Sequence, residues 1–264
     1  MFSNGFSKIF YGMDIGWIDL ILFVVLVAIT EISFLTGYRR FKKDKRVGST
    51  QTSTLSAMQT LLALLMAFTV SMATVRFETR RFNLATETNA IGTAYRRAAL
   101  LKEPHRGQIR GKLRAYVDNR IEFYRLPYDA PDLERLNREA LALQGESWEY
   151  VSELAQKDPN PVTVGPLLSA LNDMVTLQEK PSSAFENHVP DSIIFLIMTA
   201  AFILMGYLGY LNGLSGIRHF EGTLVLAVMF TLTVTVILDL DRPRRGSINV
   251  GYEGLMRLRD RFSR

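Results

Sequence analysis

The sequence predicts an all-α membrane protein, with four transmembrane helices and a helical extramembrane domain inserted between the second and the third. Hydrophobic residues make up 48% of the 264 residues and are concentrated in four blocks. Each block is near the length of about 20 residues that crosses a bilayer. Between the second and third blocks, apolar residues recur at the spacing of amphipathic helices. Much of the net charge of +5 lies beside the apolar blocks, where it fits phosphate headgroups.

The first apolar block covers Trp17 to Thr36. Trp17 at its start and Tyr38 after its end stand where aromatic rings prefer the membrane interface. A cleaved secretory signal is the competing interpretation. The block is long, however, only Lys8 is basic before it, and no small-residue cleavage site follows. We therefore expect a retained transmembrane helix.

Two acidic residues, Asp19 and Glu31, interrupt this block. An ionisable residue inside a membrane segment is a functional candidate by default and needs a partner. For Glu31, we expect a polar residue on another span, such as Gln59.

A short basic loop, RRFKKDKR at 39–46, follows the first block. The positive-inside rule alone places such a loop in the cytoplasm. Near the membrane, however, the short loops carry seven basic residues and the opposite side carries eight. Both orientations therefore stay open, and we interpret the run as a solvated linker that touches lipid headgroups.

The second block, from Leu55, is unusually rich in Thr, Ser, Ala and Met and ends in a cluster of arginines. This composition indicates a helix that faces protein or water and not lipid alone. Helical spacing of apolar residues continues past Arg81, so the helix is expected to leave the membrane as a rod up to Lys102.

Three further helices are expected in the extramembrane domain, at about Arg106 to Arg125, Asp132 to Gln156 and Leu167 to Leu177. In the third apolar block, Gly209 and Gly213 have the spacing that lets membrane helices approach closely. The C-terminal tail is expected to dock on the helical domain or on a neighbouring molecule. The predicted order is a tail at 1–16, a first span at 17–37, a basic loop at 38–54, a second span at 55–76, the helical domain at 77–191, spans at 192–214 and 223–240, and a tail at 241–264.

Three segments carry a resemblance to a known family: LLALLMAFTVSMATVRFETRRF at 61–82, NAIGTAYRRAALL at 89–101 and VILDLDRPRRGSI at 236–248. They resemble the bacterial bestrophin-like membrane proteins, a family distantly similar to the bestrophin anion channels. The resemblance implies a bestrophin-like fold and a homo-oligomer, specifically a pentamer. It also implies passive conduction of inorganic anions such as chloride, and a multi-pass location in the bacterial inner (plasma) membrane.

Within the second span, Phe68, Arg76, Phe77 and Arg81 match the bestrophin motif, whereas Ala67 replaces its glycine. Glu78 also stands where the motif has a second aromatic residue. In bestrophins, three apolar residues four apart, ending on the matched phenylalanine, line the pore constriction. The resemblance therefore implies a pore lined by Thr60, Leu64 and Phe68, with Thr60 as a polar departure.

Four-residue spacing puts these three side chains on one helix face whatever the family. The basic residues after them, Arg76, Arg80 and Arg81, would form a pore mouth that concentrates anions. Plain packing in a helix bundle explains a Leu and Phe stripe equally well, and arginines at a helix end are usually headgroup contacts. Arg76 and Glu78 are also candidates for a local ion pair.

The end of the fourth span holds a further set of charged residues, Asp239, Asp241 and Arg242, followed by Pro243. The resemblance implies that this set is a structural corner. An ion-paired helix terminus is favoured over a cation site, because a hard cation needs six or more oxygen ligands and few are near.

No enzyme is predicted, and neither a cofactor nor a metal site is expected. The chain has no cysteine, its three histidines lie in unrelated segments, and it lacks a phosphate-binding glycine loop. It also lacks a motif for nucleic acid. Three hypotheses remain: an oligomeric anion channel, a non-conducting membrane-anchored scaffold or partner-binding protein, and a secondary transporter, for which internal repeats are missing.

Overall fold

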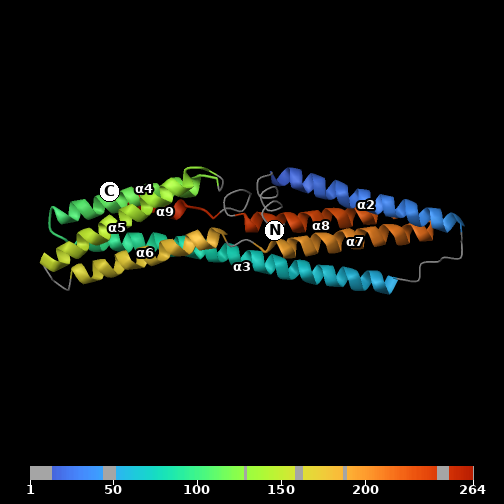
Figure 1. Ribbon diagram of the computed structural model, residues 1–264, viewed down its shortest axis with the longest axis horizontal. Coiled ribbons are helices and arrows are strands. Elements are labelled where there is room, and N and C mark those ends of the chain that lie inside the picture. The colour runs from blue at the N-terminus through green and yellow to red at the C-terminus, as the bar shows by residue number, and fades with distance from the viewer. Residues whose placement is uncertain are drawn as a thin grey trace. The chain divides into compact units, whose positions relative to one another are not determined.

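The computed structural model describes residues 14–43, 52–127, 130–157, 163–186, 189–242 and 250–263, and within these ranges every regular element is a helix. The chain divides into two compact units. The membrane unit comprises residues 1–75 and 188–242, and the helical domain comprises residues 76–187 and 243–264. The ribbon in Figure 1 shows the helices of each unit.

The membrane unit contains α2 (Ile15–Lys43), the first part of α3 (Thr52–Ala98), α7 (Asp191–Ser215) and α8 (Phe220–Asp241). All four helices are long and apolar enough to cross a membrane, as predicted. Within this unit, α2 lies along both α7 and α8 (Figure 1).

Glycines let α2 and α7 approach until their backbones touch. A Cβ atom on Gly209 would lie 2.2 Å from the carbonyl oxygen of Thr30, and one on Gly213 would lie 2.3 Å from that of Phe34. On the other helix, a Cβ on Gly37 would lie 2.3 Å from the carbonyl oxygen of Tyr210. These distances leave no room for any side chain, so the close approach predicted from the glycine spacing is confirmed.

Helix α2 is longer than the span expected at 17–37. It continues through Arg39 to Lys43, so the first residues of the basic loop expected at 38–54 are helical. Lysine and arginine favour helices, and their charges in the last turn interact favourably with the negative end of the helix dipole. The basic run therefore extends the helix to Lys43.

The helical domain contains the second part of α3 with α4 (His105–Arg125), α5 (Leu133–Lys157), α6 (Val164–Glu186) and α9 (Glu253–Phe262). In Figure 1, α5 lies along α4 and α6, and α9 lies beside α4. Helix α3 ends at Ala98, four residues before the expected Lys102, and α6 extends well past Leu177. The buried apolar side chains of the helices in this domain form one core. Five of them are almost completely enclosed: Ile91, Ile109, Leu113, Leu136 and Leu167.

Helix α9 docks on the helical domain, one of the two positions expected for the tail. The ring of Phe262 stacks on that of Tyr95, with centroids 3.6 Å apart and planes 12° from parallel. The Arg114 guanidinium donates hydrogen bonds to the Tyr95 hydroxyl and to the Phe262 carbonyl, both at 2.8 Å. Since the last carbonyls of a helix lack internal donors, Arg114 completes the C-terminal end of α9.

Candidate functional site

The membrane part of α3 has one face that packs inside its own unit. The buried residues on this face recur at spacings of four and three, as one helix side requires: Leu62, Met66, Thr69 and Ala73. Thr69 lines a small apolar gap with Ile194 and Ile197 of α7 and with Val234 and Ile237 of α8. This face therefore holds α3 against α7 and α8.

The three residues predicted to line a pore lie on the opposite side of α3. Thr60 is exposed, Leu64 is 51% exposed and Phe68 is 64% exposed. A single chain leaves this face without a partner among the described residues, so the face is available to other copies of the chain, to lipid or to water.

The exposed face of α3 differs in chemistry from that of α8. Along α8, the exposed residues from Leu224 to Val236 are large and apolar: Leu224, Val225, Val228, Met229, Leu232 and Val236. Along α3, small and hydroxyl-bearing residues are interspersed with the exposed Leu and Phe side chains: Ser56, Ala57, Thr60, Ala63, Ala67, Ser71 and Thr74. Large apolar side chains suit lipid, whereas small and polar residues mark helix contacts and water-lined surfaces.

Two hydroxyl groups on this face, those of Thr60 and Thr74, are satisfied inside α3. Thr60 donates a hydrogen bond to the carbonyl of Ser56 at 2.9 Å, and Thr74 donates one to that of Val70 at 2.8 Å. Such local bonds let a hydroxyl face an apolar neighbour at little cost. Close packing against a neighbouring helix and exposure to water are therefore both compatible with this face.

The predicted basic residues after this face have different surroundings. Arg80 is buried, with 3% of its surface exposed, and Arg76 is half-buried. Arg81 is exposed, and its guanidinium lies 3.9 Å from the Glu78 carboxylate. Glu78 is the residue expected to pair with Arg76. Of the three arginines, Arg81 has the most exposed side chain, at 69%.

At the end of α8, Asp239, Asp241 and Arg242 are all buried. The Asp241 carboxylate accepts hydrogen bonds from the backbone N–H of Val189, at 3.0 and 3.1 Å to its two oxygens. This contact joins the end of α8 to the residues that lead into α7. Pro243, the last residue of the expected corner, lies outside the described residues.

The partner of Glu31 is Arg218 and not Gln59. The Arg218 guanidinium, in the loop between α7 and α8, lies 2.5 Å from the Glu31 carboxylate. The expectation was wrong because α2 packs along both α7 and α8, which brings Arg218 of the loop between them within reach of Glu31. A second intramembrane carboxylate, Asp19, accepts a hydrogen bond from Thr235 of α8.

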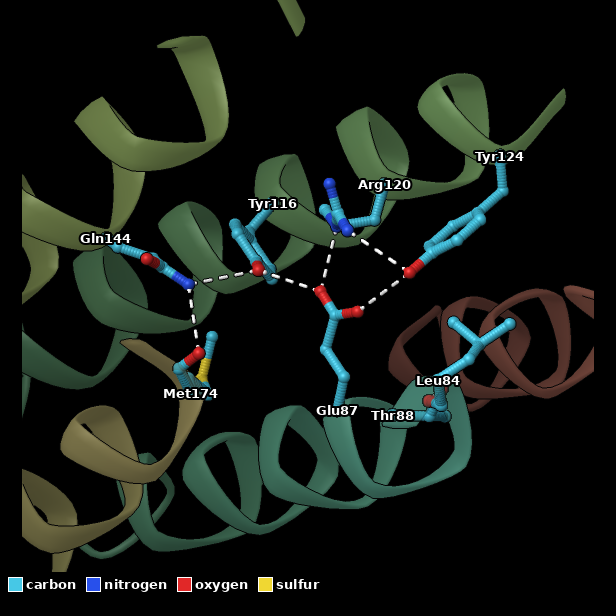
Figure 2. A network of polar contacts seen from close by, with 8 residues as sticks. All are labelled: Leu84, Glu87, Thr88, Tyr116, Arg120, Tyr124, Gln144 and Met174. Carbon is cyan, nitrogen blue, oxygen red and sulfur yellow. Dashed lines mark hydrogen bonds and ion pairs between the residues drawn. The ribbon is translucent and has the colours of Figure 1, made fainter. Parts of the chain in front are cut away.

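The helical domain encloses a polar network that the sequence analysis missed (Figure 2). Glu87 of α3 is completely buried and accepts hydrogen bonds from Arg120 at 2.8 Å, from Tyr116 at 2.9 Å and from Tyr124 at 3.2 Å, all three on α4. Gln144 of α5 donates to the Tyr116 hydroxyl at 3.0 Å and to the Met174 carbonyl of α6 at 3.3 Å. The carboxylate thus joins α3 to α4, and the hydrogen bonds of Gln144 extend the network to α5 and α6.

Burial and the Glu87 charge set the protonation of this network. Burial disfavours the charge of Arg120, but the carboxylate outweighs it and raises the pKa of the guanidinium. For Tyr116 and Tyr124, burial and the same carboxylate raise the pKa of the phenol above its ordinary value. The network therefore holds a charged pair and two neutral tyrosines away from solvent, which suits structure and not binding or catalysis.

A sequence signal for this network exists. Glu87 lies three residues after Leu84 and four before Ile91, on the apolar side of its helix, where a charge needs a buried partner. Tyr116, Arg120 and Tyr124 are spaced by four residues and share one face of α4. The spacing therefore marks Glu87 on α3 and the three polar residues on α4 as buried. It does not show that these two sets of residues contact each other.

Among the described residues, no group of three or more His, Asp or Glu side chains is arranged to hold a metal ion. His105, at the start of α4, lies with its Nδ1 atom 2.6 Å from the Tyr150 hydroxyl of α5. This contact links two helices of the domain.

Comparisons with known proteins bear on the family and on the fold. The model of the bestrophin-like domain family matches residues 23–255. No curated protein matches the chain.

Solved structures show the same fold. The crystal structure of a bacterial bestrophin homologue from Klebsiella pneumoniae has a TM-score of 0.71 at 15% identity, over 93% of this chain and 96% of that one. A variant of that homologue has a TM-score of 0.70 at 15% identity, over 92% and 96%. A structure described as a membrane protein has a TM-score of 0.73 at 14% identity, over 92% and 96%. The family match spans most of the length, so the chain belongs to the bestrophin-like family and has the all-helical bestrophin fold.

Proposed function

We propose that the protein is an oligomeric, passive anion channel of the bacterial inner membrane, with α3 lining the pore. Membership in the bestrophin-like family and the bestrophin fold support a channel and not an enzyme. The conducted ions are inorganic anions, with chloride as the first to test. The proposed assembly is a homo-oligomer, and the family resemblance supports five copies.

The observation that carries the proposal is the chemistry of the exposed face of α3. Thr60, Leu64 and Phe68 point away from the face that packs on α7 and α8, among small and hydroxyl-bearing neighbours. Copies of one helix arranged around a symmetry axis would turn this face inward. Rings of Leu64 and Phe68 would then form a constriction that controls conduction by excluding water.

Arginines supply the electrostatic part of the proposal. Arg81 has its guanidinium largely in solvent, where positive charge raises the local concentration of anions. Arg76 and Arg80 have the same proposed role at the pore mouth. Because Arg80 is buried, it would attract anions through its charge without contacting them directly.

Reconstitution tests the proposal. The purified full chain, placed in planar bilayers with a chloride gradient, is expected to carry an anion-selective current. Phe68→Ala is expected to increase that current, because a smaller side chain widens and wets the constriction. Phe195→Ala is the matched control, since Phe195 of α7 is also 64% exposed but lies on another helix.

The oligomeric state in detergent provides the second measurement, because one copy of four membrane helices cannot surround an axis with α3. A monomer or dimer without current would overturn the channel and favour the alternative, a non-conducting scaffold or partner-binding protein. Equal effects of Phe68→Ala and Phe195→Ala on the current would show that α3 does not line the pore. Another helix would then have to line it.

A further inference from the structure

Basic residues gather at one end of the membrane unit, where α2 ends and a short loop joins α7 to α8. Their side chains are exposed: Arg39, Arg40, Lys42, Lys43 and Arg218. The two segments are in contact, because a Cβ atom on Gly216 of the loop would lie 2.7 Å from the ring of Phe41. The positive charges of α2 and of the loop therefore belong to one surface.

Aromatic and polar partners hold three of these cations in place. Arg40 donates a hydrogen bond to the Tyr210 hydroxyl at 3.0 Å. The Lys42 ammonium lies 5.0 Å from the ring centre of Tyr38, which itself stacks between Phe34 and Phe41. Cations over aromatic rings keep their charge and lose side-chain freedom. This surface is thus partly ordered before any ligand binds.

Arg218 is held in the same way. Its guanidinium lies 5.8 Å from the ring centre of Phe34 and 5.6 Å from that of Phe220, and it pairs with Glu31. Glu31 offsets one positive charge and Glu221, exposed at the start of α8, offsets another. Five cations against these two carboxylates leave the surface positive.

Exposed apolar side chains adjoin the cations. Ile32 and Leu35 of α2 are 63% and 52% exposed, and Ile217 of the loop is 58% exposed. Because α2 is long and apolar enough to cross a membrane, Ile32 and Leu35 lie at the depth of acyl chains when the basic turn lies at the headgroups. A ligand with a negative head and an apolar tail fits both halves of the surface.

We infer that this surface binds the phosphate headgroup of an anionic phospholipid, with Arg40, Lys42 and Arg218 as the residues that contact it. Guanidinium and ammonium groups are the usual partners of phosphate oxygens. The adjoining apolar side chains favour a lipid over free phosphate, which has nothing to place against them. The inference does not depend on ion conduction by the protein.

Thermal unfolding of the purified full chain in detergent tests this inference. The probes are phosphatidylglycerol, phosphatidylcholine with the same acyl chains, and inorganic phosphate. Binding to the folded state raises the unfolding temperature, so phosphatidylglycerol is expected to raise it well beyond phosphatidylcholine. The variant Arg40→Gln/Lys42→Gln is expected to bind phosphatidylglycerol about fivefold more weakly for each charge removed.

The matched control is Arg257→Gln/Arg261→Gln, which removes two exposed charges from α9 and is expected to bind like the unmodified chain. Lys42→Gln alone is the second variant if the double variant does not fold, because Lys42 is exposed and contacts the face of the Tyr38 ring. Equal shifts of the unfolding temperature with the two lipids would overturn the inference. So would a response to phosphatidylglycerol that is unchanged in Arg40→Gln/Lys42→Gln and in Lys42→Gln. A full shift with inorganic phosphate alone would also overturn it, since the ligand would then be a free anion.

Discussion

The carboxylate of Glu87 and the guanidinium of Arg120 form an ion pair at 2.8 Å, with 0% and 1% of their side chains exposed. Each charge is removed from water and is tolerable only because the other is present. Tyr116 and Tyr124 donate further hydrogen bonds to Glu87, and Gln144 of α5 is linked to the pair through Tyr116 (Figure 2). The pair itself joins α3 to α4.

Glu87→Gln is expected to destabilise the protein by about 3–5 kcal/mol, because it leaves the Arg120 charge buried without its partner. The measurement is the free energy of unfolding of the full chain in detergent. Glu122→Gln is the control, since Glu122 pairs with Arg135 at 3.8 Å on the surface and should contribute under about 1 kcal/mol. Equal destabilisation by the two substitutions would contradict the role of the buried pair.

The raised pKa of Tyr124 predicts a pH dependence of stability. The folded state holds the phenol proton more tightly than the unfolded chain, so this stabilisation is complete below the ordinary pKa of 10.0 and is lost as pH rises above it. Tyr124→Phe is expected to be less stable than the unmodified chain at pH 7 and to lose less stability above pH 10. Unfolding curves at a series of pH values measure this difference.

Tyr252→Phe provides the comparison for that series, because Tyr252 lies at the start of α9 and outside the network. A difference between Tyr124→Phe and the unmodified chain that stays constant from neutral to alkaline pH would argue against the raised pKa.

Gly209→Ala is expected to prevent the close packing of α2 on α7, because the new Cβ atom would lie 2.2 Å from the Thr30 carbonyl oxygen. The yield of folded protein after purification and its unfolding temperature should both fall. Gly222→Ala is the matched control on α8, where a Cβ meets nothing within 4 Å and alanine favours the helix. Similar behaviour of the two variants would exclude a backbone contact at Gly209.

Phe262→Ala is expected to release α9 from the domain, since it removes the ring that stacks on Tyr95 at a cost of about 3–5 kcal/mol. Amide hydrogen exchange over Glu253–Phe262 should become faster, while exchange over α5 stays slow. Arg257→Ala, an exposed change on the same helix, should leave exchange unaltered. Unchanged protection of α9 in Phe262→Ala would show that the helix is held by other contacts.

Arg81→Gln is expected to lower the proposed anion conductance at low salt and to have little effect at high salt, because screening weakens the field of an exposed charge. Single-channel current at two chloride concentrations measures this effect. Arg125→Gln is the control, an exposed arginine at the end of α4. A fall of equal size in the control would indicate a general charge effect and not a pore mouth.

Local patterns in the sequence were enough to predict the four spans, the helices of the domain and the glycine contact of α7. Runs of apolar residues, helical spacing and small-residue spacing are properties of neighbouring positions, and the structure agrees with them. The same patterns placed Thr60, Leu64 and Phe68 on one face of one helix.

Tertiary structure decided which distant residues meet. Glu31 pairs with Arg218 because α2 packs along both α7 and α8, and no local pattern contains that choice. Glu87 finds Arg120 for the same reason, since α4 returns to lie against α3 within the helical domain. Which charges meet in the interior depends on how whole helices pack. Local sequence patterns therefore determined the helices, and only the tertiary structure determined these ion pairs.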